Sequence, residues 1–236
     1  MTQHRNCWLP RILLALACGL SISVAADDSS LAPVADPRPI LDDLQRKMAS
    51  VRTVYFEFTQ ERQLKLFTDP LKSEGVMLIQ RPDQIRWETT SPYQTILLAN
   101  RKSVAQFEGT DGSWKKLDLA FPQLLRRVMD QMALMNQGKL DALTADYSVL
   151  VSTGHVAVLT LVPKDENARS LLSSLVVTLQ ADFTGTREVV LNEPGGDLTR
   201  ITFRKEKRDA HFPDGTFDQS HPLDIAVVKA AVTHGL

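Results

Sequence analysis

The segment that decides the fold spans residues 56–92 and reads FEFTQERQLKLFTDPLKSEGVMLIQRPDQIRWETTSP. It contains runs that alternate with the period of two expected of β-strands, and Arg81-Pro82-Asp83-Gln84 supplies the turn between two of them. The segment contains no catalytic motif. It therefore predicts an antiparallel hairpin, and it points toward binding rather than chemistry.

The strand that leads into this segment sorts its side chains onto two faces. Val54, Phe56 and Phe58 point one way, and the residues between them point the other way. Residues 76–79 are apolar on both faces, whereas residues 85–88 alternate strictly, which predicts one side in water for that strand. Part of the sheet must therefore be covered on both sides, or face a cavity.

The rest of the chain continues this pattern, with two helices inserted. Further strands are predicted at 75–80, 85–89, 95–99, 103–107, 147–151, 156–162, 175–181, 187–192 and 199–203. One helix begins after Pro39 and turns Leu41, Leu44, Met48 and Val51 to one side. Helices that are inserted rather than alternating with strands indicate an α+β fold dominated by one curved antiparallel sheet.

The second predicted helix spans residues 122–137 and is the expected cover for the sheet. Its apolar side includes Met129, Met132 and Met135. Two interpretations are open for this side. It is an ordinary core stripe, or it is a flexible thioether wall that repacks around varied apolar cargo.

The N-terminus has the layout of a secretory signal. Arg5 and Arg11 precede an apolar run that ends in small residues, so cleavage is expected after Ala25 or Ala26. The run is shorter than the ~20 residues that a transmembrane helix needs. We expect a soluble, exported protein. Cys18 is either lost with the signal or lipidated, because the residues before it weakly resemble a lipobox.

Composition excludes several classes of function. Both cysteines, Cys7 and Cys18, lie in the expected signal, so the mature chain offers no disulfide and no thiolate chemistry. The formal net charge is −1, and removing Arg5 and Arg11 makes it more negative. A nucleic acid partner is therefore not expected.

Catalytic and metal-binding patterns are weak. Neither the Gly-x-Ser-x-Gly motif nor the His-Glu-x-x-His motif occurs. His211, Asp214, Asp218 and His221 offer metal-ligand chemistry, but Asp214-Gly215 is also ordinary turn sequence, so we expect no metal and no cofactor. We predict that the protein is not an enzyme.

Arg81 also has two interpretations. It follows a strand that is apolar on both faces, and its guanidinium can donate several hydrogen bonds to carbonyls across the mouth of the sheet. The alternative is a solvated arginine in a turn.

A set of short motifs resembles the periplasmic lipoprotein carrier family, LolA. The set covers most of residues 40–203, and its order and spacing carry the resemblance rather than any one motif. Its members are Phe58-x-Gln60-x-Arg62, Glu74-Gly75, Gln80-Arg81-Pro82, Arg86-Trp87-Glu88, Pro92, Pro163 and the run from Glu193 to Phe203.

The resemblance implies an incomplete, half-open β-barrel with helices as a lid over an apolar cavity. It divides the chain into a signal peptide (1–26), a flexible leader (27–39), the half-barrel domain (40–205) and a polar C-terminal tail able to dock on the sheet (206–236). Arg81 matches the family arginine that ties the lid closed. We expect cavity and lid residues at Leu44, Met48, Phe56, Phe58, Leu78, Trp87, Met129, Met132 and Met135.

The implied function is periplasmic transport by a monomer. Its cargo would be the acyl chains of a lipoprotein or a glycolipid-like lipid, received from an inner-membrane releasing complex or transporter and passed to an outer-membrane acceptor. Residues 105–109 and 117–134 depart from the family pattern, which indicates a divergent branch with a different cargo. The alternative is a non-enzymatic scaffold or accessory module of an envelope lipid exporter.

Overall fold

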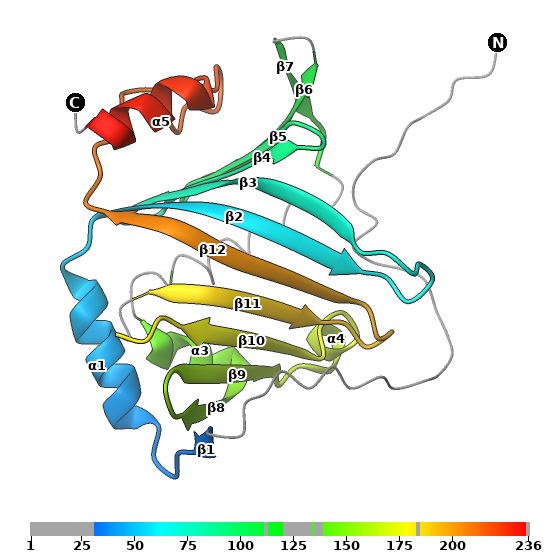
Figure 1. Cartoon of the computed structure of the whole chain (residues 1–236), viewed down its shortest axis with the longest axis vertical. Helices are drawn as coiled ribbons and strands as arrows, with labels where there is room; N and C mark the ends of the chain where they lie inside the picture. The colour runs from blue at the N-terminus through cyan, green and yellow to red at the C-terminus, as the bar shows by residue number, and fades with distance from the viewer. Residues whose placement is uncertain (1–30, 111–112, 120–133, 135–138, 183–184, 235–236) are drawn as a thin grey trace.

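The structure is a computed structural model that describes residues 31–110, 113–119, 134, 139–182 and 185–234 (Figure 1). Several sequence predictions lie outside these residues. They are the signal peptide with its cleavage site, the fate of Cys18, and the methionine side of the second predicted helix, with Met129, Met132 and Met135.

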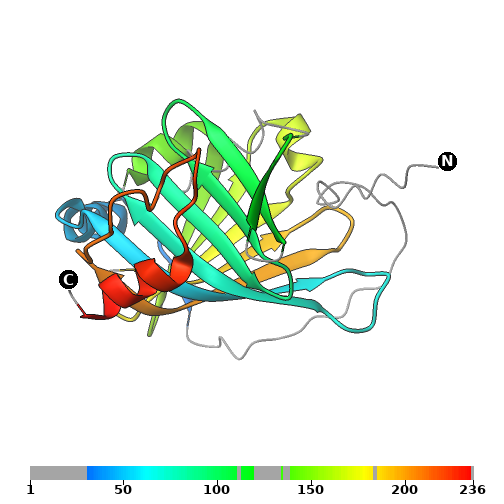
Figure 2. The same cartoon turned by 90° about the horizontal axis from the view of Figure 1, so that it is seen from above.

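Twelve strands of the described residues form one sheet in the order β1-β8-β9-β10-β11-β12-β2-β3-β4-β5-β6-β7, and all neighbours are antiparallel. The sheet is curved and does not close, because β1 and β7 form its two edges (Figures 1 and 2). The strands are β1 (Ala32–Pro33), β2 (Thr53–Gln63), β3 (Leu71–Gln80), β4 (Gln84–Ser91), β5 (Thr95–Ala99), β6 (Val104–Thr110), β7 (Ser113–Leu117), β8 (Tyr147–Thr153), β9 (Ala157–Pro163), β10 (Ser174–Leu179), β11 (Thr186–Asn192) and β12 (Leu198–Arg208). This confirms the predicted mainly-β fold with one curved antiparallel sheet.

The central hairpins follow from the pattern of the 56–92 segment. Phe56 lies opposite Met77, and Met77 lies opposite Trp87, so these three side chains share one face of β2, β3 and β4. We call this face of the sheet the inner face. The face that carries Tyr55 and Leu78 is the outer face.

Four helices accompany the sheet among the described residues: α1 (Arg38–Ala49), α3 (Leu140–Asp146), α4 (Glu166–Arg169) and α5 (Ile225–His234). Helix α1 begins after Pro37, whose ring fixes a backbone angle suited to a helix start. Leu41 and Leu44 of α1 and Leu143 of α3 are buried together against β8, β9 and β10. None of the described helices is long and apolar enough to span a bilayer.

The chain after β12 returns to cover the outer face of the central strands. Phe212 and two residues of α5, Val228 and Val232, pack against Val76 and Leu78 (Figures 1 and 2). Because both faces of β3 are covered, the run that is apolar on both sides has a physical explanation.

This cover corrects the prediction that β4 has one side in water. Arg86 and Glu88 point to the outer face, yet their exposed fractions are 0% and 2%. The Arg86 guanidinium donates to Glu88 Oε2 at 2.9 Å and 2.6 Å, and to the carbonyl oxygens of Thr216 and Leu223 at 2.9 Å and 2.6 Å. The polar positions of this alternating strand form a buried ion pair, because the segment that covers them, with the Thr216 and Leu223 carbonyls, comes from far along the chain.

The strand boundaries differ from the predicted ones mostly by a few residues, but some elements were not predicted. Ala32 and Pro33, within the segment expected to be a flexible leader, pair with β8 as strand β1. The edge strand β7 and the short helices α3 and α4 were also missed. Strand β12 continues to Arg208, beyond the boundary expected at residue 205.

Candidate functional site

The inner face carries a broad apolar surface over the central strands. Its buried members are Val54, Phe56, Phe58, Met77, Ile79, Ile85, Ala99 and Ile201, and the half-buried ones packed against them are Val51, Trp87, Leu97, Val104, Leu191 and Phe203. The ring of Phe56 lies 5.2 Å from that of Phe203, and the ring of Phe58 lies 5.1 Å from that of Trp87, measured between centroids. Both contacts have the tilted geometry that aromatic pairs favour.

This surface is continuous with the one under helices α1 and α3. Val177, Val189 and Ile201 lie opposite one another on β10, β11 and β12, and residues opposite each other in antiparallel strands share a face. Val177 belongs to the cluster under α1, and Ile201 belongs to the central cluster. The two clusters are therefore neighbouring parts of one inner face.

The structure brings together most of the predicted cavity residues that it describes. Phe56, Phe58 and Trp87 lie in the central cluster, and Leu44 and Met48 of α1 lie in the neighbouring cluster. Leu78 is the exception. It is buried on the outer face beneath α5, so the expectation that it shares the inner face with the others is wrong.

Half-buried residues on the inner face were missed by the sequence reading. Leu97 lies opposite Trp87, and Leu191 and Phe203 come from β11 and β12. The pattern that could have identified them is the alternation of apolar and polar residues within these short strands. This pattern is weak because each strand has few apolar residues on that face.

Arg81 lies at the turn between β3 and β4, beside the C-terminal end of α1. Its two terminal nitrogens donate hydrogen bonds of 2.8 Å to the Ala49 carbonyl oxygen and 2.5 Å to the Met48 carbonyl oxygen. The last carbonyls of a helix lack partners within the helix, and a cation there also interacts favourably with the helix dipole. Arg81 therefore connects the sheet to the end of α1.

The surroundings of Arg81 are partly open. Burial lowers the pKa of its guanidinium and the nearby Asp209 opposes this shift, but an arginine stays protonated at neutral pH. An open hollow of about 670 Å³ borders the same side chain. Its lining residues are Arg52, Thr53, Gln80, Arg81, Pro82, Ala210, His211 and Phe212.

The described residues contain no group of three or more histidine, cysteine or acidic side chains placed to hold a metal ion. His211, Asp214, Asp218 and His221, which were weighed as ligands, are therefore not brought together. The carboxyl of Asp218 instead accepts hydrogen bonds from Ser220, which hold its pKa below its usual value.

Comparison with known proteins identifies the family. The model of the family described as "Outer membrane lipoprotein carrier protein LolA" matches residues 49–220, which include the central hairpins, Arg81 and the first part of the outer cover but not helix α5. The chain belongs to the LolA family. Within the LolA family, it is 22% identical over 226 residues to an outer-membrane lipoprotein carrier protein of Pseudoalteromonas translucida, covering 93% of this chain and 95% of the relative.

A second relative carries the same description. A LolA-family protein of Dechloromonas aromatica, also described as an outer-membrane lipoprotein carrier protein, is 24% identical over 211 residues, covering 84% of this chain and 92% of the relative. Among solved structures, the LolA superfamily protein NE2245 from Nitrosomonas europaea covers 79% of this chain and 99% of its own, with a TM-score of 0.41 and 10% identity. The 22% and 24% identities to the two lipoprotein carrier proteins place this chain as a divergent LolA-like member.

Proposed function

We propose that this LolA-family protein is a periplasmic carrier that holds the acyl chains of a lipoprotein or another lipid against its inner face. It receives this cargo from an inner-membrane complex and passes it to an outer-membrane acceptor. The observation that carries the proposal is the continuous inner face, where apolar side chains from β2–β5, β11 and β12 gather, and where Trp87, Leu97, Leu191 and Phe203 stay half-buried. Export through the signal at residues 1–26 is part of the proposal.

The free-energy cost of exposing acyl chains to water explains why such a carrier is needed. Each methylene moved from water to an apolar surface contributes about 0.8 kcal/mol, so a sixteen-carbon chain in water costs on the order of 12 kcal/mol. A lipid with two or three chains therefore crosses an aqueous compartment slowly unless its chains are covered. A curved sheet with one apolar face provides that cover.

Release of the cargo requires a competitor for the same surface. In this proposal α1 is a lid, because Leu41 and Leu44 cover the apolar side chains of β8–β10. Arg81 favours the closed lid through its bonds to Met48 and Ala49. Lid and cargo then compete for the inner face, and the balance sets the affinity.

Binding of a fluorescent fatty-acid probe tests the inner face. The variant Leu97→Gln places an amide of similar size on this face, and we expect about tenfold weaker binding because apolar contact is lost and a polar group is buried. Leu150→Gln is the matched control, since Leu150 lies on β8 with 63% of its surface exposed. Equal probe affinity in all three proteins, or no binding by the unmodified protein, would contradict the proposal.

Replacing Arg81 with leucine tests whether this residue keeps the α1 lid closed. Without the two bonds to α1, we expect about tenfold faster hydrogen exchange of the amides at the C-terminal end of α1, more bound lipid and slower transfer to an acceptor. Arg101→Leu is the control, because Arg101 is an exposed arginine in the neighbouring β5–β6 turn that contacts Asp83. If Arg81→Leu leaves lipid loading, lipid transfer and hydrogen exchange unchanged, Arg81 does not keep the lid closed.

A further inference from the structure

Exposed apolar side chains gather at one end of the sheet. Among the described residues six large apolar side chains are exposed, and four of them lie in the β2–β3 and β4–β5 connections or at the first residue of β3: Leu66 (78%), Phe67 (57%), Leu71 and Tyr93. Arg62 pairs with Leu71 and Glu74 pairs with Ser91, so both connections lie at the same end of the sheet. We call these four residues the apolar tip. Arg81 and the end of α1 lie at the opposite end.

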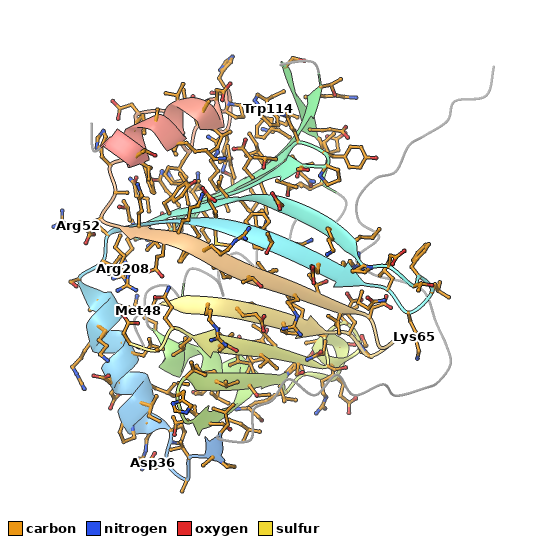
Figure 3. The ribbon with its side chains drawn as sticks, viewed as in Figure 1. Asp36, Met48, Arg52, Lys65, Trp114 and Arg208 are labelled. Atoms are coloured by element: carbon orange, nitrogen blue, oxygen red, sulfur yellow. The ribbon has the colours of Figure 1, made fainter. Side chains whose placement is uncertain are left out.

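Two hydrogen bonds hold the β2–β3 connection. The backbone N–H of Lys65 donates to Asp197 Oδ1 at 2.8 Å, and Asp197 belongs to the turn between β11 and β12. The side-chain amide of Gln63 donates to the Phe67 carbonyl oxygen at 3.0 Å. Figure 3 shows Lys65 at the far end of this hairpin, away from Arg52 and Met48. Leu66 and Phe67 are therefore presented to solvent by an ordered turn.

The apolar tip is separate from the cluster on the inner face. Between Phe58 and the tip, the inner face carries the polar side chains of Gln60 and Ser73, which lie opposite each other on β2 and β3. The exposed tip is therefore not the frayed end of the core. It is a second apolar surface that projects from the sheet, and such a surface marks an interaction site.

We propose that the apolar tip docks on a lipid bilayer and inserts Leu66 and Phe67 into its interfacial region. The tip lies where the β2–β3 hairpin extends beyond the rest of the sheet (Figure 1), and it combines aliphatic and aromatic side chains, which suits a deformable apolar medium better than a preformed protein groove. Lys65 and Lys72 flank it, both exposed, with side chains long enough to reach lipid phosphates, although Lys72 is shared with Glu61, 3.0 Å away. The choice of a bilayer also rests on the proposed function, because an acyl cargo begins and ends its journey in a membrane.

Vesicle flotation tests this surface. The full-length protein, as purified from cells, is mixed with vesicles of phosphatidylethanolamine and phosphatidylglycerol, and the fraction that floats gives the partition coefficient. We expect the double variant Leu66→Ser/Phe67→Ser to lower this coefficient about tenfold or more, because both inserted side chains are lost. Binding should persist at 0.5 M salt, since apolar insertion is not screened as charge attraction is. Leu150→Ser, equally exposed but on β8, should float like the unmodified protein.

Three results would overturn the proposal: no flotation of the unmodified protein, equal flotation of the double variant, or binding lost in salt. A further contrary result is self-association of the unmodified protein that the double variant abolishes, which would assign the tip to a second copy of the chain. Binding of the fatty-acid probe is measured on the same variants. It should be unchanged by the tip substitutions, so failure of the tip proposal and failure of the carrier proposal are distinguishable.

Discussion

Replacing Arg86 with methionine is expected to lower the free energy of unfolding by about 3–5 kcal/mol. The substitution leaves the buried Glu88 carboxylate without its cation, and it removes the donor that the Thr216 and Leu223 carbonyls share. Burial already raises the pKa of Glu88 even with Arg86 beside it, which shows how unfavourable this site is for a lone carboxylate. Chemical denaturation at neutral pH measures the loss.

A second substitution separates charge from packing in this prediction. In Arg86→Met/Glu88→Leu both charges are absent, so we expect a large part of the lost stability to return. Hydrogen exchange in residues 210–232 should rise in the single variant, because Arg86 ties this segment to β4. A loss below ~1 kcal/mol in Arg86→Met would mean that the C-terminal cover does not depend on the ion pair.

Replacing Phe58 with alanine is expected to cost about 3–5 kcal/mol of stability. The ring is buried against Trp87 on one side and over Gly75 on the other, where a Cβ atom would lie within 2.6 Å of a ring atom. Gly75 therefore makes room for this ring, and removing the ring leaves a cavity beside a position with no side chain to fill it. Thermal or chemical unfolding followed by circular dichroism measures the effect.

The matched control for Phe58 is Phe67→Ala. This residue is mostly exposed at the apolar tip, so its removal should change the stability by less than ~0.5 kcal/mol. Equal effects of the two substitutions would contradict the assignment of Phe58 to the core and Phe67 to the surface. Phe58 is thus predicted to support the inner face, while cargo contact falls to half-buried neighbours such as Trp87 and Leu97.

The sequence predicts the central strands well because their side chains alternate. Val54, Phe56 and Phe58 are assigned to one face by their spacing, and the structure confirms this. Leu78 shows the limit of the same rule. In a run that is apolar on both faces, periodicity does not tell which residues point inward, and the pairing of Phe56 with Met77 settles it.

The sequence does not predict which strands are covered by segments that lie far away in the chain. Arg86 and Glu88 have the spacing of a solvated strand face, and the carbonyls that satisfy Arg86 come from residues more than 120 positions later. The bonds of Arg81 to α1 depend equally on tertiary placement. The sequence indicates an arginine able to bind carbonyls, but the identity of those carbonyls follows from where α1 ends.

The most direct test of the carrier proposal is mass spectrometry of lipid bound to the protein purified from its own cells without detergent. The account predicts acyl lipid bound to the unmodified protein and to Leu150→Gln, and markedly less bound to Leu97→Gln. The same measurement identifies the cargo as a lipoprotein or another lipid. Absence of acyl lipid from the unmodified protein, together with an inner face that takes up no fatty-acid probe, would contradict the account.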